Sequence, residues 1–347
     1  MRIFSETVNR KNISVLTEIP SHIEYRSGFP TTAHFSAGES CSLGCIGCIN
    51  PKCMRFDLSD IMCDEVKNFP SDQSLNVCPV DALQWDYETD TPTVSTDKCI
   101  ACGICVNRCP VGAIYFDNAI KVNKLSSDKE IRSAVDNATI ALQTRQIDAL
   151  NATRKSGVPI MESDELIEPI YEKLLDIKSN YHNRIARNLL ISLGCRSAMR
   201  RIGDVYTRMD AVYASADHCF GAIEVEFGKE TLDASRGILE DIAVLHTRYG
   251  IEKHTNMPLV ICLQLPNERQ GYWQVVKDIK VVEKIVVSTI TVGALMLLNW
   301  NRCLLIPDAA VYYRDYDNMR LRSVISRQIG RDVQLSDKQL GILEPMK

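Results

Sequence analysis

The most informative stretch of this sequence is Cys99-Ile-Ala-Cys102-Gly-Ile-Cys105-Val-Asn-Arg-Cys109-Pro110. Its four cysteines follow the spacing C-x2-C-x2-C-x3-C, and a proline comes directly after the last of them. Ten of the 14 cysteines of the chain fall between residues 41 and 109. Cysteines crowded in this way in a large cytosolic chain bind metal more often than they form disulfides, because disulfides persist in oxidising compartments. The spacing therefore predicts a small metal-binding domain, which we place at residues 41–125.

The run that begins at Cys99 resembles the C-x2-C-x2-C-x3-C-P motif of bacterial ferredoxins with two [4Fe–4S] clusters. In that family the first three cysteines bind one cluster, and the fourth binds the neighbouring cluster. Upstream, Cys78-Pro-Val-Asp-Ala-Leu has the same ending as Cys109-Pro-Val-Gly-Ala-Ile, so half of the motif is present twice. The resemblance implies that Cys78 completes the cluster held by Cys99, Cys102 and Cys105.

The second predicted cluster depends on cysteines further upstream. The stretch Cys45-Ile-Gly-Cys48-Ile-Asn-Pro-Lys-Cys53 is similar to the C-x2-C-x4-C variant of ferredoxin-like electron-transfer subunits. This resemblance implies that Cys45, Cys48, Cys53 and Cys109 hold the second cluster. About 24 residues separate Cys53 from Cys78, where the ferredoxin motif has three, so the register of the ligands stays open.

Other interpretations of these cysteines remain. Cys41, Cys45 and Cys48 form a competing ligand set, whose C-x3-C-x2-C spacing also matches radical S-adenosylmethionine enzymes. The cysteine-rich region is too short for the barrel that holds the cluster in those enzymes. Four-cysteine zinc sites are a further alternative, although they rarely need the Cys-Pro pattern. Outside the favoured ligand sets, six cysteines are expected to be ordinary buried thiols, namely Cys41, Cys63, Cys195, Cys219, Cys262 and Cys303.

Length and composition limit the architecture. The 347 residues allow two or three domains, and the 45% hydrophobic and 24% charged residues are typical of globular proteins. Residues 1–178 carry 18 Lys and Arg against 25 Asp and Glu, whereas residues 179–347 carry 22 against 19. The C-terminal half is therefore the better candidate to meet a polyanion. Glu6 precedes any apolar run that could serve as a signal peptide, so we expect a cytoplasmic protein without membrane contact.

The apolar periodicity predicts a multidomain chain of the α+β or α/β class. We expect an N-terminal segment (1–40) of unknown role, the ferredoxin-like domain (41–125), a helical linker (126–160) and an α/β domain (161–347) with a mixed sheet flanked by helices. Helices are predicted over 164–177, 182–193, 232–249 and 273–280, and strands over 82–85, 113–116, 259–265 and 285–298. The last of these is the longest apolar stretch, and it is shorter than the roughly 20 residues that cross a bilayer.

Three acidic residues of the C-terminal half lie in two strand-like segments. Residues 203–213 contain Asp210, and residues 220–228 contain Glu224 and Glu226. The segments should form a hairpin, in which the two glutamates share one face and Asp210 joins them from the neighbouring strand. Three carboxylates packed together repel one another unless a hard cation such as Mg²⁺ or Mn²⁺ lies between them. The pattern predicts a metal site for phosphate chemistry.

The order of helix, hairpin, helix and strand is similar to the PD-(D/E)xK core of restriction endonucleases and related DNA exonucleases. The resemblance covers about residues 165–300 and implies a restriction-endonuclease-like domain with Mg²⁺-dependent deoxyribonuclease activity. Asp210 and Glu224 would be metal ligands. Glu226 stands where the family usually has lysine, and Lys229 is close enough along the chain to replace it. Either side chain would orient the attacking water, or Glu226 would bind a second metal ion.

The sequence therefore favours a metal-dependent DNA nuclease whose ferredoxin-like module is structural, redox-sensing or used for docking. By analogy with the nucleases that it resembles, the protein could take part in defence against foreign DNA together with partner subunits of such a system. Oligomerisation is also left open. The alternative is an electron-transfer subunit of an oxidoreductase complex. No flavin or nicotinamide glycine motif accompanies the clusters, so a self-contained reductase is not expected. An acidic strand face in contact with solvent is the simplest competing interpretation of Glu224 and Glu226.

Overall fold

The computed structural model describes residues 52–88, 91–109, 114–117, 121–124, 164–228, 231–305 and 321–346. These residues divide into two compact units. The first unit contains residues 52–55 and the described residues between 76 and 124, and the second contains residues 56–75 together with those from 164 onwards. The predicted N-terminal segment (1–40) and the predicted helical linker (126–160) lie outside the described residues.

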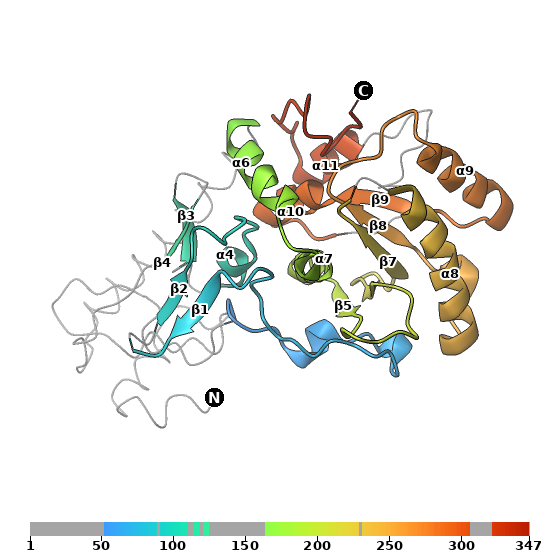
Figure 1. Ribbon diagram of the computed structural model, residues 1–347, viewed down its shortest axis with the longest axis horizontal. Helices are drawn as coiled ribbons and strands as arrows, with labels where there is room; N and C mark the ends of the chain where they lie inside the picture. Colours follow the sequence, from blue (N-terminus) through green and yellow to red (C-terminus); the bar gives the residue numbers. More distant parts are fainter. Residues whose placement is uncertain are drawn as a thin grey trace. The chain divides into compact units, whose positions relative to one another are not determined.

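The described residues of the first unit form two short hairpins and one helix, which are labelled in Figure 1. The hairpins are β1 (Leu83–Asp86) with β2 (Thr91–Val94), and β3 (Ile114–Asp117) with β4 (Lys121–Lys124). The helix is α4 (Ile104–Arg108). Strands β1 and β3 confirm the predictions made after each Cys-Pro pair. The repeated half of the cysteine motif is thus followed in both places by the first strand of an antiparallel hairpin.

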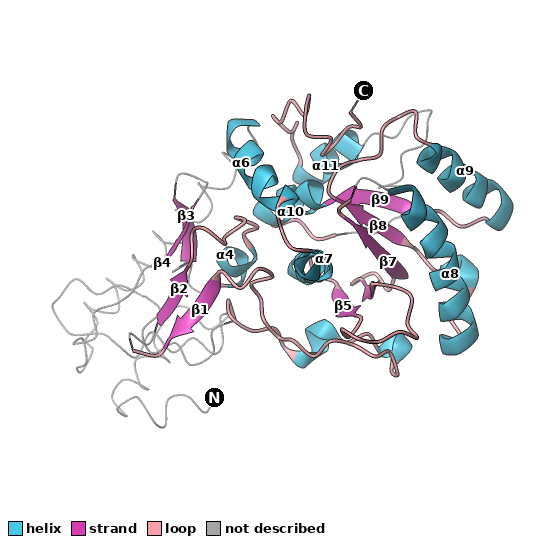
Figure 2. Ribbon diagram, viewed as in Figure 1, coloured by secondary structure: helices cyan, strands magenta, loops and turns pink. Residues whose placement is uncertain are grey.

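The second unit is built on a five-stranded mixed sheet between helices (Figure 2). The strand order is β5-β6-β7-β8-β9; the first three strands are antiparallel, and β7, β8 and β9 are parallel. The strands are β5 (Arg196–Met199), β6 (Ala211–Ala214), β7 (Phe220–Glu226), β8 (Leu259–Cys262) and β9 (Ser288–Thr291). The predicted hairpin is therefore confirmed as β6 and β7, and β8 follows where an apolar strand was expected.

Helices lie on both faces of this sheet. Helices α8 (Thr231–Tyr249) and α9 (Gly271–Glu283) pack together on one side, and α7 (His182–Ser192) and α10 (Val292–Trp300) pack together on the other. In the described part of the second unit, the other helical elements are α6 (Asp164–Leu175), α11 (Leu321–Ile329) and the short 3₁₀ turns η2 (Leu58–Ile61), η3 (Asp64–Val66), η5 (Ser179–Tyr181) and η6 (Lys253–Thr255). In the described part of the chain, no helix has both the length and the apolar character needed to span a bilayer.

The apolar stretch at residues 285–298 differs from its predicted strand. It forms the four-residue strand β9 and then α10, in which all nine residues are buried. Thr291 ends the strand and caps the helix, because its Oγ1 accepts a hydrogen bond from the N–H of Ala294 at 3.1 Å. A helix buried on every side has no polar face, so its sequence looks the same as that of a buried strand.

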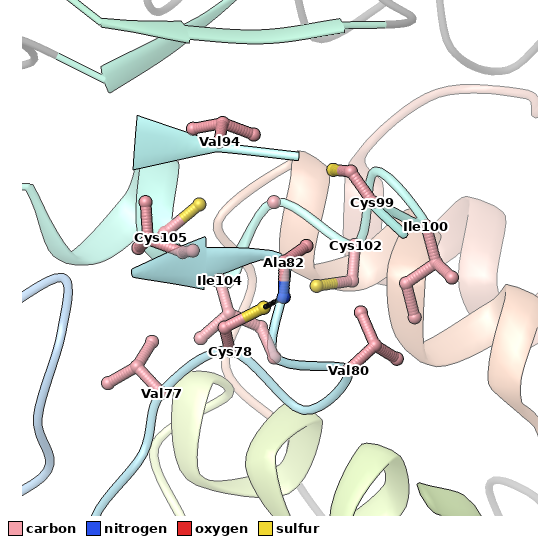
Figure 3. A pocket seen from close by; sticks show the side chains of 12 residues that line it. Val77, Cys78, Val80, Ala82, Val94, Cys99, Ile100, Cys102, Ile104 and Cys105 are labelled. Carbon is pink, nitrogen blue, oxygen red and sulfur yellow. Dashed lines mark hydrogen bonds between the residues drawn. The ribbon is translucent and has the colours of Figure 1, made fainter. Parts of the chain in front are cut away.

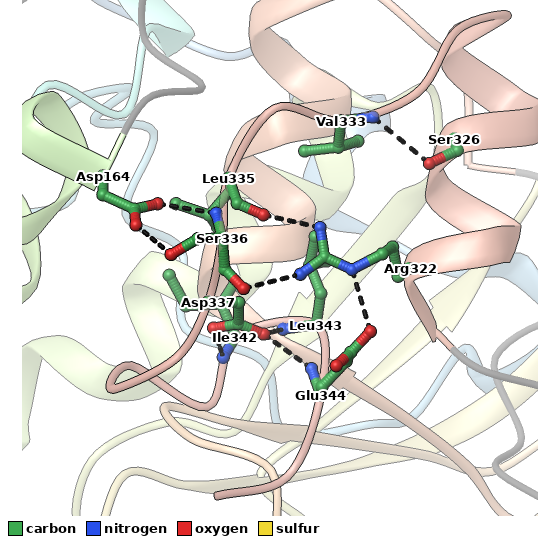
Figure 4. A network of polar contacts seen from close by, with 10 residues as sticks. All are labelled: Asp164, Arg322, Ser326, Val333, Leu335, Ser336, Asp337, Ile342, Leu343 and Glu344. Carbon is green, nitrogen blue, oxygen red and sulfur yellow. Dashed lines mark hydrogen bonds and ion pairs between the residues drawn. The ribbon is translucent and has the colours of Figure 1, made fainter.

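Polar contacts hold the C-terminal residues 333–346 against α11 and the end of β9, and those made by Arg322 and Asp337 are drawn in Figure 4. The buried carboxylate of Asp337 accepts hydrogen bonds from the backbone N–H groups of Ile342 at 2.8 Å and Glu344 at 2.7 Å. Arg322 of α11 pairs with Glu344 at 2.9 Å. Thr291 at the end of β9 donates its hydroxyl to the carbonyl of Ile342 at 2.6 Å. These bonds hold the chain end beside β9.

Residues 56–75, here called the inserted segment, explain the unusual gap between Cys53 and Cys78. They group with the second unit, so the predicted continuous domain at residues 41–125 is interrupted. The two ends of the segment meet, because the N–H of Phe56 donates to the carbonyl of Leu75 at 2.8 Å. A β-bridge between Arg55 and Asn76 lies next to this bond, so the chain leaves and re-enters the first unit at adjacent residues.

The inserted segment covers the edge of the sheet at β5. The N–H of Asp72 donates to the carbonyl of Met199 at 2.7 Å, and the N–H of Arg201 donates to the carbonyl of Pro70 at 2.8 Å. A β-bridge between Ser71 and Arg200 lies between these two bonds. Exposed strand edges invite pairing with other chains, and this segment occupies the edge with backbone hydrogen bonds.

Candidate functional site

Four predicted cluster ligands line one cavity in the first unit (Figure 3). They are Cys78, Cys99, Cys102 and Cys105, and their sulfur atoms face the same space. The rest of the wall is largely apolar and includes Val77, Val80, Val94, Ile100 and Ile104. The structure thus brings together the set that the repeated Cys-Pro ending implied.

The backbone around this cavity is shaped to present sulfur. Ala101 and Gly103 have positive φ angles of 51° and 80°, which curl the loop between the cysteines. The N–H of Ala82 donates to the Sγ of Cys78 at 3.1 Å, and the N–H of Ala101 donates to the Sγ of Cys99 at 3.4 Å. Backbone donors aimed at sulfur stabilise the negative charge of cluster-bound thiolates. The loop therefore suits an iron–sulfur cluster.

Electrostatics favour a cationic occupant of the cavity. Burial raises the pKa of the Cys102 and Cys105 thiols well above the ordinary value, and neighbouring cysteines raise both further. Burial also raises the pKa of Cys78. Bound iron would offset this cost, because a metal ion deprotonates its thiol ligands. Each thiolate of a [4Fe–4S] cube binds a different iron atom, so the four sulfurs need not converge on one point.

The second predicted cluster is described only in part. Cys53 and Cys109 are both buried. The pKa of the Cys105 thiol is raised mainly by burial and by the cysteines of the first cluster, and Cys53 is close enough to raise it further. Arg108, next to Cys109, donates its Nε–H to the carbonyl of Lys52, next to Cys53, at 2.9 Å. The two predicted ligands are therefore on segments that touch. Their predicted partners Cys45 and Cys48, and the competing Cys41, lie outside the described residues.

The carboxylates of the second unit meet at the hairpin of β6 and β7. Ala211 opposes Ile223 in this ladder, so Asp210 and Glu224 occupy the next cross-strand position. Their carboxyl groups lie within hydrogen-bonding range of each other. Asp210 is held in place by the Nδ2–H of Asn183 on α7 at 2.8 Å and by the N–H of Val225 at 3.0 Å. The site is thus assembled from α7, β7 and the residue before β6.

Asp241 of α8 joins this pair, although it was not among the predicted site residues. Its side chain is fully buried, and neither carboxylate oxygen has a hydrogen-bond donor. The carboxyl group of Glu224 lies within hydrogen-bonding range of it. Gly237, one turn earlier on α8, permits this approach, because a Cβ there would lie 3.1 Å from Oε1 of Glu224. Two carboxylates can make such a contact only if they share a proton or a cation.

The ionisation of Glu224 and Asp241 is disfavoured, because both carboxyl groups are buried next to each other. Burial raises the pKa of Glu224 well above its ordinary value, and the charges of Asp241 and Asp210 raise it further. Burial also raises the pKa of Asp241; the adjacent carboxyl group of Glu224 partly lowers it, and the charge of Asp210 raises it further. A cation at this position would relieve both costs, because it favours the ionised carboxylates.

Glu226 lies at the same end of β7 but is oriented differently. Its Oε1 accepts the N–H of Gly228 at 2.6 Å. Its negative charge also affects His182 at the start of α7. Burial lowers the pKa of His182, whereas the hydrogen bond with the carbonyl of Ile177 and the charges of Glu226 and Asp210 raise it. Lys229, the predicted alternative to Glu226, lies outside the described residues.

Metal-binding capacity was the key prediction for these residues. Within the described ranges, no three His, Cys, Asp or Glu side chains are placed so that one metal ion could bind them all. The predicted convergence of Asp210, Glu224 and Glu226 on one metal ion is therefore not observed within these ranges. Mg²⁺ is commonly held by one or two carboxylates together with water and substrate phosphates.

A sequence signal for Asp241 does exist. It occupies the buried stripe of α8 with Ile238, Ile242 and Leu245, where an acidic residue is out of place unless it has a partner. An aspartate in an otherwise apolar helical stripe could have drawn attention to this residue.

Comparison with known families supports the iron–sulfur assignment. Residues 92–115 match the family described as 4Fe-4S binding domain, and this range contains Cys99, Cys102, Cys105 and Cys109. The region is therefore an iron–sulfur binding module of ferredoxin-like character. Searches of curated proteins and of solved structures found no match to the chain.

Proposed function

We propose that this chain is a nuclease that hydrolyses DNA phosphodiesters with a divalent cation and carries two [4Fe–4S] clusters in its ferredoxin-like module. The observation that carries the nuclease proposal is the contact between Asp210, Glu224 and the unpartnered buried Asp241. Around it, the order α7, β5, β6, β7, α8, β8 agrees with the helix, hairpin, helix and strand of the PD-(D/E)xK core. This agreement supports a restriction-endonuclease-like fold for the second unit.

In this proposal, each residue of the carboxylate site has a separate role in the hydrolysis. Asp210 and Glu224 hold the cation, and Asn183 keeps the Asp210 carboxylate in position through its amide hydrogen bond. When bound, Mg²⁺ or Mn²⁺ lowers the pKa of a water molecule and neutralises charge on the scissile phosphate. Glu226, held by the N–H of Gly228, orients the attacking water. Lys229 remains the alternative for that role.

Amidation of Glu224 tests this proposal most directly. Glu224→Gln removes the negative charge with little change in shape, so the protein should fold and lose at least about a hundredfold in DNA cleavage rate with Mg²⁺ or Mn²⁺. Glu283→Gln, at an exposed position at the end of α9, is the matched control and should cleave as fast as the wild type. A chelator should abolish cleavage. Equal rates for wild type and Glu224→Gln would show that the site is misplaced.

Two clusters are proposed because the segments of Cys53 and Cys109 touch through Arg108. Protein purified without oxygen should contain about eight iron and eight sulfide ions per chain. Cys53→Ser should reduce the iron content to about half, because one cluster keeps all its predicted ligands. Stoichiometric zinc without acid-labile sulfide would instead favour the zinc interpretation.

Electron transfer is the second candidate function, and the match of residues 92–115 to the 4Fe-4S binding domain family favours it. An electron-transfer protein has no use for Glu224 as a metal ligand. In that case Glu224→Gln would leave the reduction and reoxidation rates of the clusters unchanged, and the wild type would not cleave DNA under any of the metal conditions above.

A further inference from the structure

The loop that joins β5 to β6, residues 200–208, exposes an unusual amount of apolar surface. Ile202, Val205 and Tyr206 are 80%, 77% and 78% exposed. Among the described residues, only Tyr87 is a more exposed large hydrophobic side chain. Single exposed apolar residues are common, but three within five positions form a patch that suits a binding partner.

The exposure does not result from a loose backbone. Oδ1 of Asp204 accepts the N–H groups of Tyr206 and Thr207, both at 2.8 Å, which closes a tight turn. Arg200 donates to the carbonyl of Thr207 at 2.8 Å, and Arg248 at the end of α8 donates to the carbonyl of Tyr206 at 2.8 Å. These bonds hold the loop from both sides and present its apolar side chains outward. Such preorganisation lowers the entropic cost of binding.

The excess of positive charge around the patch favours an anionic partner. Arg200, Arg201 and Arg208 belong to the loop, Arg248 adjoins it, and Asp204 is the single acidic residue between positions 200 and 208. Two of these arginines also contact carboxylates outside the loop, Arg208 with Glu240 at 2.6 Å and Arg200 with Asp210 at 3.6 Å, which leaves Arg201 and Arg248 as the cations of this group that form no ion pair within the described residues. Arginines beside an exposed aromatic ring are the combination with which proteins bind single-stranded nucleic acid, because the ring stacks on bases and the guanidinium groups contact phosphates.

The loop also begins and ends at the carboxylate site. Arg200 lies 3.6 Å from Oδ1 of Asp210, and Arg208 is two residues before Asp210 in the chain. A strand whose phosphate reached Asp210 and Glu224 would therefore pass beside this loop. Base faces are open to stacking in unpaired strands and hidden in a duplex, so the patch favours unpaired bases.

We propose that the β5–β6 loop binds unpaired bases of a DNA strand beside the carboxylate site, with Tyr206 stacked on a base and the loop arginines on its phosphates. The choice of DNA rests on the proposed nuclease function. The loop accordingly directs the nuclease to single-stranded or locally opened DNA.

Binding without cleavage tests the loop separately from the chemistry. The full chain, purified without oxygen, would be titrated into a fluorescein-labelled single-stranded oligonucleotide and the matching duplex without divalent cations, and anisotropy would be recorded. Tyr206→Ala should raise the Kd for the single strand at least about tenfold, within the range for loss of one stacked base. Tyr206→Phe keeps the ring and should bind as the wild type does. Val282→Ala, a 71% exposed position on α9, is the matched control and should have no effect.

The outcomes separate the two proposals. If Tyr206→Ala binds the single strand as tightly as the wild type, or if the wild type prefers the duplex, the loop inference is overturned even when DNA is cleaved. A patch used for docking another protein would give this same unaffected DNA binding. If binding depends on Tyr206 but no metal condition yields cleavage, the nuclease proposal fails and the loop inference stands.

Discussion

Replacing Arg187 with methionine should destabilise the second unit, because this buried arginine of α7 holds the inserted segment. Its side chain is completely buried. The guanidinium donates to the carbonyl of Ser74 at 3.0 Å and to Oδ1 of Asn188 at 2.9 Å, and its Nη1 lies 3.8 Å from the carboxylate of Asp72. Burial lowers the pKa of Arg187 to about 10, so the group stays protonated at neutral pH.

The magnitude follows from what the substitution leaves behind. Two acceptors, on Ser74 and Asn188, lose their donor, at a cost of about 1–3 kcal/mol each. Asp72 keeps part of its hydration, because its side chain is 20% exposed. Nη1 of Arg187 has no hydrogen-bond partner, so removing it offsets part of the loss. We expect a net destabilisation of about 3 kcal/mol.

Arg196 provides the matched control, because it also binds the inserted segment. It contacts Asp64 at 2.7 Å and Glu65 at 2.9 Å, but the three side chains are 34%, 81% and 30% exposed. Exposed ion pairs contribute about 0–1 kcal/mol, so Arg196→Met should have a small effect.

Thermal unfolding of the two variants distinguishes these cases. For a unit of this size, Arg187→Met should lower Tm by about 6–12 °C and Arg196→Met by less than about 4 °C. Amide hydrogen exchange at residues 196–201 should accelerate in the first variant, because the segment that pairs with β5 is loosened. Equal Tm shifts for the two variants would refute the reasoning that burial, and not the number of contacts, decides the strength of this attachment.

Three further predictions concern the cluster cavity, the carboxylate pair and the packing of α10. Cys102→Ser should lower iron content and soluble yield more than Cys262→Ser, because only the first thiol lines the cluster cavity; iron analysis and yield of soluble protein check this. Without divalent cations, the Tm of Glu224→Gln should equal or exceed that of the wild type, and the difference in Tm should widen between pH 5 and pH 8. The pKa of Glu224 is raised on folding, so the wild type loses stability as the pH rises above 4.5, the pKa of this group in the unfolded chain, whereas the glutamine variant does not. A difference in Tm that narrows with rising pH would contradict the burial of Glu224. Gly293→Ala should cost about 1–3 kcal/mol in chemical denaturation, since a Cβ would lie 2.6 Å from two side-chain atoms, whereas Gly271→Ala, with 3.9 Å of space, should be nearly neutral.

Local pattern alone determined much of this protein. The spacing of Cys99, Cys102 and Cys105 reports a backbone that must curl within seven residues, so it can be recognised without knowing the rest of the chain. The helices α7 and α8 and the hairpin of β6 and β7 follow from apolar periodicity, because each element buries one face. The pairing of Asp210 with Glu224 was predictable for the same reason.

Tertiary structure alone decided the features that depend on contacts distant in sequence. Residues 285–298 became a strand followed by a helix because packing surrounds α10 on all sides and removes the periodicity that would identify it. The inserted segment joined the second unit because its hydrogen bonds are made to β5 and α7, more than 100 residues away. Asp241 reached Glu224 because α8 folds back across β7 and lacks a side chain at Gly237. Sequence spacing describes neighbours along the chain, whereas these contacts exist only once the sheet and its helices have packed.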